Sequence, residues 1–145
     1  MSSPPLLERW PNADERSLLR SSFARLIPQS DQAVVEFYDQ LFAHHPDVRP
    51  LFPADLTDLH EKFMMMLAWF IEYLDRPDEA AVEAQKLGQR HRHYGAAAGH
   101  YGPVGGVLLG VLTQHAGLNE AEVAAWGNLY GLICELMLAG ATGNS

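Results

Sequence analysis

Cysteine and clustered basic residues are scarce in this 145-residue chain. Cys134 is the only cysteine, which excludes an internal disulfide and a thiolate metal cluster. Lys and Arg number 10 against 18 Asp and Glu, giving a formal net charge of −8. Because no basic cluster interrupts this acidity, we expect neither a nucleic acid nor an anionic membrane surface as a partner.

Long apolar stretches are lacking as well. The two longest strongly apolar runs, residues 63–71 and 102–112, are too short to cross a bilayer. Residues 1–10 contain prolines and a glutamate and lack the apolar core of a signal peptide. We therefore expect a cytoplasmic protein with no membrane-spanning segment.

The composition that remains is that of a globular, helical domain. Hydrophobic residues make up 48% and charged residues 19% of the chain, and Val, Ile and Thr are sparse beside Ala and Leu. The length suits one core with one enclosed ligand cavity. We expect a short N-terminal extension over residues 1–11, a main domain over 12–140 and a C-terminal tail over 141–145.

Capping residues mark the ends of several predicted helices. Asn12 with Glu15 has the pattern of a capping box that begins the first helix, and Asn119 with Glu122 repeats it before the last one. Ser30 is expected to cap the second helix, whose apolar residues follow a helical spacing.

Prolines and glycines mark the boundaries of the middle helices. Pro46 and Pro50 bracket a short turn-like helix, since the residue before each proline is pushed out of the helical basin. The longer helices are expected over residues 57–74, from Pro77 to Gly95 and from Pro103 to Gly117. Six main helices, one short helix and no strand predict an all-α domain of crossed helices.

The stretch LGQRHRHYGAAAGHYGPVG, residues 87–105, carries the clearest chemical signal. His91 lies near the end of a predicted helix, one turn after Leu87. A neutral imidazole there, facing a second helix, can hold a haem iron from one side. His93 is the competing ligand, but it lies about 200° further around the helix, so only one of the two faces the pocket.

This stretch closely resembles the proximal side of the bacterial globins, namely the single-domain haemoglobins and the globin domain of flavohaemoglobins. In those proteins a leucine supports the haem, a histidine one turn later binds the iron, and a tyrosine corner follows. The resemblance implies these roles for Leu87, His91 and Tyr101. Gly102 stands between Tyr101 and the proline, a small departure from the family pattern.

A second match lies in FYDQLFAHHPDVRPLF, residues 37–52. It resembles the globin segment in which a tyrosine faces the gas and a phenylalanine packs on the haem, which implies those roles for Tyr38 and Phe52. A buried phenol at the open face of the iron can donate a hydrogen bond to a partly anionic gas. The alternative is that Tyr38 is an ordinary core aromatic residue.

The helix expected over the open side departs from the family. Alignment of Lys62–Leu67 with the family's basic run places Phe63 over the haem and puts Leu59 where a glutamine commonly stands. Tyr38 would then be the only donor to the gas. A register shift of one residue would instead make His60 a distal ligand, but it would turn Phe63 away from the buried stripe by about 100°.

Other polar residues are assigned by the same resemblance or left without a role. Lys62 and Arg90 are candidates to pair with the haem propionates, and an ordinary solvated face is the alternative. The flavohaemoglobin glutamate that pairs with the proximal tyrosine falls at Ala141, and Glu135 lies on a different helical face. The remaining histidines are expected to be solvent-exposed or corner residues without a metal role: His44, His45, His100 and His115.

The resemblance covers residues 12–140 and implies a globin fold around haem b, iron protoporphyrin IX. The leading interpretation is a globin that reversibly binds O2, NO or CO at a pentacoordinate iron, as in oxygen transport. A second interpretation is a nitric oxide dioxygenase served by a separate reductase, because no glycine-rich phosphate loop is present. A six-coordinate haem sensor and a domain that has lost haem stay as further alternatives, and the oligomeric state is open.

Overall fold

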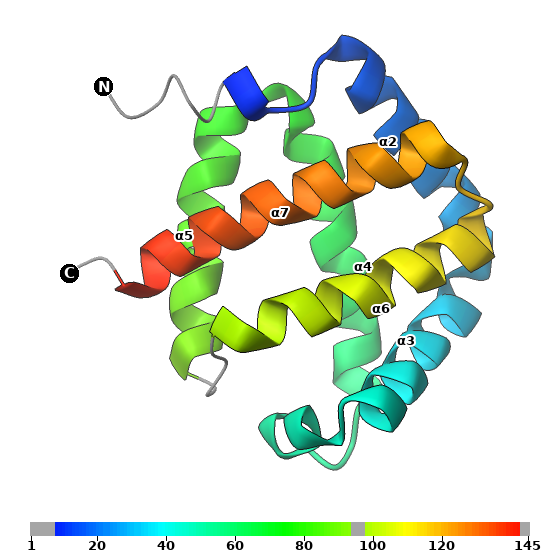
Figure 1. The fold of residues 1–145 in the computed structure, drawn as a ribbon, viewed down its shortest axis with the longest axis vertical. Coiled ribbons are helices and arrows are strands. Elements are labelled where there is room, and N and C mark those ends of the chain that lie inside the picture. Colours follow the sequence, from blue (N-terminus) through cyan, green and yellow to red (C-terminus); the bar gives the residue numbers. More distant parts are fainter. Residues whose placement is uncertain (1–7, 94–97, 143–145) are drawn as a thin grey trace.

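The computed structural model describes residues 8–93 and 98–142, and this part of the chain is helical with no strand. The α-helices are α2 (Ala13–Leu26), α3 (Ser30–His44), α4 (Thr57–Glu72), α5 (Pro77–His93), α6 (Ala98–Ala116) and α7 (Glu120–Thr142). Short 3-10 helices η1 (Ile27–Gln29), η2 (Pro46–Leu51) and η3 (Tyr73–Asp75) follow α2, α3 and α4. The expected all-α architecture is confirmed (Figure 1).

Both predicted capping boxes are present. The backbone N–H of Glu15 donates to Asn12 Oδ1 over 2.9 Å, and Glu15 Oε1 accepts the Asn12 N–H over 2.8 Å. Glu122 and Asn119 exchange the same two bonds over 2.8 and 3.0 Å. Each box satisfies N–H groups that the first helical turn leaves without a partner, which fixes where the helix begins.

Three boundary predictions were wrong. Ser30 is the first residue of α3, and no side chain caps that helix, because η1 leads into α3 with nearly continuous helical backbone. Helix α4 ends at Glu72 and gives way to η3, two residues before the expected end. Pro103 lies inside α6, because Ala98 to Gly102 already form a helical turn before it. Gly95 lies outside the described residues.

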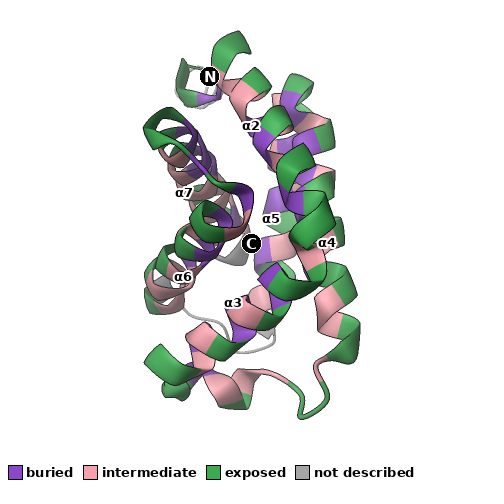
Figure 2. Ribbon diagram, turned by 90° about the vertical axis from the view of Figure 1, so that its right-hand side faces the viewer, coloured by how far each residue is buried: buried purple, intermediate pink, exposed green. Residues whose placement is uncertain are grey.

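The core lies between two layers of helices. Figure 2 shows buried residues on the inward faces of α6 and α7 on one side and of α2, α3 and α4 on the other. Most buried apolar side chains belong to one cluster that runs through these helices. A smaller cluster joins Phe70 of α4, Ala84 of α5 and Met137 of α7.

Helices α5 and α7 form the most extensive helix contact of the described chain, and they cross one another (Figure 1). Two glycines lie at this contact. A Cβ built on Gly88 would lie 1.9 Å from the carbonyl oxygen of Met137. A Cβ on Gly140 would lie 2.2 Å from the carbonyl oxygen of Gln85. The two backbones therefore touch directly, and this contact fixes the position of the helix that carries His91.

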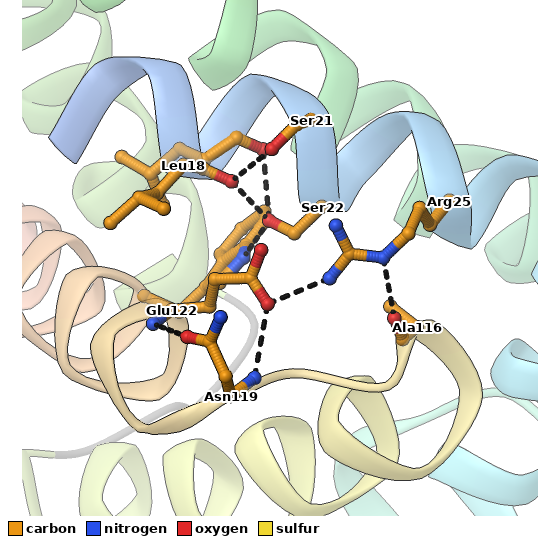
Figure 3. A network of polar contacts seen from close by, with 9 residues as sticks. Leu18, Ser21, Ser22, Arg25, Ala116, Asn119 and Glu122 are labelled. Atoms are coloured by element: carbon orange, nitrogen blue, oxygen red, sulfur yellow. Dashed lines mark hydrogen bonds and ion pairs between the residues drawn. The ribbon is translucent and has the colours of Figure 1, made fainter. Parts of the chain in front are cut away.

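A polar network joins α2 to the corner between α6 and α7 (Figure 3). Arg25 donates from Nε to the Ala116 carbonyl over 2.9 Å and from Nη2 to Glu122 over 2.7 Å. The Glu122 side chain is 5% exposed, and its bond to Arg25 lowers the pKa of the carboxyl. Beside it, Trp126 donates to the buried Ser22 hydroxyl over 2.8 Å. Gly117, with φ +65°, makes the left-handed turn that lets the corner close, as expected for the end of α6.

One finding differs from the expectation that no segment could span a membrane. Within the described residues, the stretch Glu120–Gly140 of α7 is long and apolar enough to do so by length and composition. Core helices of soluble proteins pass the same test, and α7 packs against α2, α5 and α6. The finding is therefore weak evidence for a membrane location.

Candidate functional site

His91 lies in the last turn of α5 and is held by a backbone carbonyl of the preceding turn. Its Nδ1 lies 2.9 Å from the Leu87 carbonyl oxygen. A carbonyl only accepts hydrogen bonds, so Nδ1 carries the proton and the lone pair of the neutral ring is on Nε2. This is the tautomer that a metal ligand requires, and the bond also fixes the orientation of the ring.

The protonation equilibrium of His91 favours the neutral ring as well. Burial lowers the pKa of His91 below its ordinary value of 6.5, and the charge of Arg90 lowers it further, while the bond to Leu87 acts in the opposite direction. The imidazole is therefore neutral at pH 7, with Nε2 free to coordinate a metal. His93 closes α5, but its side chain lies outside what the structure describes.

Leu87 and Tyr101 belong to the same side of the molecule as His91. Both are half-buried and pack against the cluster of Phe70, Ala84 and Met137. The Tyr130 hydroxyl of α7 donates to the Tyr101 carbonyl over 2.7 Å and so ties the start of α6 to α7.

Gly105 makes room for this tie, because a Cβ there would lie 2.4 Å from the Tyr130 ring. Glu135 is exposed and pairs with Arg9, so it takes no part in the tyrosine contact. Ala141, where the family glutamate was expected, lies in α7, and its side chain is not described.

Tyr38 lies at the centre of a group of rings from α3, α4 and the segment between them. Five rings surround it at centroid distances of 5.0 to 6.3 Å: Phe37, Phe42, Phe52, His60 and Phe63. Phe37 and Phe63 also contact each other, as do Phe42 and Phe52. The structure therefore brings together the three aromatic residues predicted for the open side, Tyr38, Phe52 and Phe63.

The hydroxyl of Tyr38 is buried without a partner in the described part of the chain. The residue is 6% exposed, and no hydrogen bond to it is found within residues 8–93 and 98–142. Burial raises the pKa of Tyr38 to about 12, so the phenol keeps its proton. An unpaired polar group in an apolar setting costs free energy, and such groups call for an explanation such as an absent ligand.

His60 and Leu59 are both half-buried on α4, and Leu59 packs against the core. The His60 ring stacks on the Tyr38 ring with centroids 5.6 Å apart and planes 20° apart. Phe63 and Leu67 are nevertheless buried. The first turns of α4 thus carry both the contact of His60 with Tyr38 and the buried residues Phe63 and Leu67. Whether His60 or Leu59 faces the gas stays a prediction.

The segment after η2 is anchored by a residue that the sequence analysis missed. Arg49 donates to the carbonyls of Phe52, Pro53 and Ala54 over 3.0 to 3.3 Å, and its guanidinium lies 4.8 Å from the Phe42 ring centroid. These bonds hold Phe52 against Tyr38. An arginine in a turn is a common surface feature, so no signal in the sequence marked this role.

The two parts of the candidate site meet along α4. Phe63 contacts Tyr38, and Phe70 belongs to the cluster against which Leu87 packs. Residues i and i+7 lie on one face of a helix, so one face of α4 serves both the Tyr38 rings and the turn that precedes His91. Helix α4 thus contacts residues predicted for both sides of the site.

The charged candidates and His115 lie outside the group of residues around Tyr38 and His91. Lys62 and Arg90 are exposed, which suits a contact with propionates at a pocket edge but equally a solvated face. Of the two options expected for His115, the structure shows the corner position: it lies at the end of α6, its side chain is 12% exposed, and Nε2 lies 2.8 Å from Glu36 of α3. Among the described residues, no group of three or more His, Cys, Asp or Glu could hold a metal ion.

Two side chains of the candidate site, one a possible metal ligand and one a hydrogen-bond donor, fit a haem. His91 presents a free Nε2 lone pair on an oriented ring, and Tyr38 presents a buried donor without a partner. Four phenylalanine rings and the His60 ring surround that donor and give it the largely apolar setting that suits a porphyrin.

Comparisons with known proteins bear on the fold and the family of the chain. The family model described as Globin matches residues 35–137. The chain is 25% identical over 126 residues to a protein named flavohemoprotein from Bacillus thuringiensis subsp. konkukian and to another from Bacillus anthracis, covering 84% of this chain. It spans 31% of the length of these relatives. The structure of a bacterial globin from Campylobacter jejuni matches with a TM-score of 0.77 and 20% identity, covering 90% of this chain and 96% of that one.

Proposed function

The chain belongs to the globin family, and from this premise we propose that it is a haem protein that reversibly binds a diatomic gas. The observation that carries the proposal is the bond from His91 Nδ1 to the Leu87 carbonyl, which leaves Nε2 as the free lone pair. The names of the flavohemoprotein relatives support haem as the cofactor. Haem b and a cytoplasmic location stay predictions.

His91 would hold the cofactor through Nε2. When bound, haem would supply an iron that binds a diatomic gas such as O2, NO or CO. The bond to Leu87 keeps the ring in one tautomer and one orientation, and the lowered pKa of His91 keeps a competing proton off Nε2 near pH 7.

Tyr38 would donate a hydrogen bond from its hydroxyl to the gas. O2 becomes partly anionic when it binds, and a hydrogen bond to a charged acceptor is stronger than one between neutral groups. The surrounding rings, which include Phe52 and Phe63, exclude water from this donor. Leu59 packs against the same core cluster. We expect this exclusion to slow the loss of ligand and the oxidation of the iron.

The first experiment is the absorption spectrum of the haem-reconstituted protein, reduced with dithionite and free of gas. A broad five-coordinate spectrum that turns sharp with CO supports an open gas site. His91→Gly should lose stoichiometric haem, and added imidazole should restore it. His93→Gly is the matched control and should retain haem. Loss of haem in His93→Gly with retention in His91→Gly would assign the axial ligand to His93.

A nitric oxide dioxygenase activity is a second candidate, favoured by the flavohemoprotein relatives. Such turnover needs an electron after each cycle, and a separate reductase would supply it. Steady consumption of NO with O2 and an added flavin reductase supports the enzyme. Consumption of one equivalent only supports reversible binding as the function.

A further inference from the structure

An aromatic stack runs from the surface at the end of α4 and at η3 into the core. The Arg76 guanidinium lies 4.1 Å from the Tyr73 ring centroid. The Tyr73 and Trp69 centroids are 4.2 Å apart, and Trp69 meets Phe70 edge-on with centroids 4.7 Å apart. Phe70 is buried in the small cluster that α4 shares with α5 and α7. The stack therefore connects the solvent with the cluster on the His91 side.

Trp69 differs from the other two tryptophans of the chain. Trp10 and Trp126 are buried, and each donates a hydrogen bond over 2.8 Å from its indole N–H to an oxygen of the core. Trp69 is half-buried, and no hydrogen bond from its indole is found within residues 8–93 and 98–142. It therefore presents a large apolar ring and an N–H donor at the surface, the combination that favours tryptophan at interfaces.

The exposed side of the stack has the composition of a protein interface. Met65, one helical turn before Trp69, is 63% exposed, the largest fraction among the large apolar side chains of the described residues. Tryptophan, tyrosine, methionine and arginine are enriched at interfaces, and a few such anchors supply most of the binding energy. We call Met65, Trp69, Tyr73 and Arg76 the Trp69 surface.

The rim of the Trp69 surface carries more acidic than basic groups. Glu61, Lys62 and Glu72 are exposed on α4, and Glu79 of α5 lies 3.5 Å from the Arg76 guanidinium. Together with the net charge of −8, this rim favours a partner with basic groups and repels an anionic membrane. A second copy of the chain would bring an identical acidic rim, and like charges oppose such a contact.

We propose that the Trp69 surface is the docking site of an electron-donating flavoprotein, with Trp69 as the anchor and basic groups of the partner around it. The inference rests on the proposed function, because an electron is needed to return ferric iron to the ferrous state that binds O2. The reduced flavin of the partner loses one electron and the iron gains it, with no bond formed or broken. The site suits this task because Trp69 and Leu87 pack against the same cluster.

The first test compares two reductants of the haem-reconstituted ferric protein under CO. One is a purified NADPH-dependent ferredoxin reductase, a flavoprotein that recognises acidic electron carriers, and the other is dithionite, which needs no docking. The rate at which the ferrous CO spectrum appears is measured by stopped flow. Trp69→Ala should slow reduction by the reductase about thirtyfold, the loss typical of an interface anchor, and leave reduction by dithionite unchanged. Ile27→Ala, at a 53% exposed apolar residue outside the Trp69 surface, is the matched control and should change neither rate.

A second pair of variants avoids any change in the packing of Trp69. Met65→Lys places a positive charge at a 63% exposed position in the Trp69 surface and should slow reduction by the reductase about tenfold, because it repels a basic partner. Val35→Lys introduces the same charge at a 45% exposed position on α3 and should leave the rate within about twofold of the unaltered protein.

A further readout involves no electron transfer. In the diamagnetic CO form, the three tryptophans give three indole N–H signals in an NMR spectrum. Addition of the oxidised reductase should shift the Trp69 signal and leave those of Trp10 and Trp126 in place, because these two are buried and hydrogen-bonded. Salt at about 0.5 M should reverse the shift, since it screens the charged rim.

Several outcomes overturn the inference. They include equal rates with the reductase for Trp69→Ala and Ile27→Ala, equal rates for Met65→Lys and Val35→Lys, and a reductase that neither reduces the unaltered protein nor shifts its Trp69 signal. Self-association that Trp69→Ala abolishes, measured by sedimentation velocity, would assign the surface to a second copy and also overturn it. Failure of the unaltered protein to take up haem or to bind CO after dithionite is seen before any reductase is added, so it identifies a failure of the proposed function itself.

Discussion

The two sides of the candidate site are built in different ways. On the His91 side, the position of α5 is set by backbone contacts: Gly88 and Gly140 let α5 and α7 touch, and a backbone carbonyl orients the histidine ring. On the Tyr38 side, the arrangement is set by side chains, because interlocking rings from α3 and α4 surround the phenol. Backbone contacts have no rotamers to adjust, whereas rings can repack.

This difference suits the two tasks of a haem protein. An axial ligand must be held in one orientation, and a rigid helix crossing achieves that without depending on the cofactor. A gas site must admit and release a ligand, which requires side chains that can move on a short timescale. We therefore expect substitutions on the His91 side mainly to lower the free energy of unfolding. Those on the Tyr38 side should mainly change the rates at which the gas binds and leaves.

The largest expected effect is that of Gly88→Ala. A Cβ at this position would lie 1.9 Å from the Met137 carbonyl oxygen, so the two backbones must separate. We expect the free energy of unfolding to fall by about 3 kcal/mol or more, measured by urea denaturation followed by circular dichroism.

The matched control for Gly88→Ala is Gly106→Ala in α6. Gly106 is exposed, and a Cβ there meets nothing within 4 Å. Alanine forms helix more readily than glycine, so this variant should gain about 0.5–1 kcal/mol. Equal and small effects at both positions would show that the α5–α7 crossing is not the rigid element argued for above.

The second effect in size concerns Phe63, which is buried among the rings around Tyr38. Phe63→Ala leaves a cavity and should cost about 3 kcal/mol. Phe63→Leu should cost less than about 1.5 kcal/mol, because the remaining rings can repack around a residue of similar volume. A leucine variant as unstable as the alanine variant would mean that the Tyr38 side is as rigid as the His91 side.

A smaller effect separates the buried Tyr38 from the half-buried Tyr130. Tyr38→Phe removes an unpaired hydroxyl and should leave the free energy of unfolding unchanged or raise it by up to about 1 kcal/mol. Tyr130→Phe removes the donor to the Tyr101 carbonyl and should lower it by about 1 kcal/mol. Destabilisation of the haem-free protein by Tyr38→Phe would reveal a structural partner of the hydroxyl and weaken its assignment to the gas.

The sequence offered roles for single residues on both sides of the site, but it did not predict how the two sides are built. His91, Leu87, Tyr38 and Phe52 could be assigned because helix periodicity and family motifs are properties of short stretches. The capping boxes at Asn12 and Asn119 were also local, and both are confirmed. The functional roles of these residues still await the experiments above.

The features that sequence reasoning missed depend on residues far apart in the chain. The contact of Gly88 with Met137 joins helices that no local pattern pairs. The bond between His115 and Glu36 joins α6 to α3, and no pattern within either helix predicts this pair. The stacking of His60 on Tyr38 joins α4 to α3, and the sequence pattern of α4 alone does not predict it.

The smallest effect concerns the dependence of stability on pH on the His91 side. Burial is the main cause that lowers the pKa of His91 in the folded protein, so between the unfolded and folded pKa values the unfolded chain binds more protons. The haem-free protein should therefore lose stability as the pH falls from about 7 through the ordinary imidazole range, and this loss should level off once the folded protein also takes up the proton.

Unfolding free energies measured across this range for the unaltered protein and for His91→Gln isolate the contribution of His91, because all other titrating groups are common to both. The slope against pH should be smaller in His91→Gln. An equal slope would mean that His91 is not desolvated in the folded chain, and the preorganised neutral ligand would then have to be a consequence of haem binding rather than of the fold.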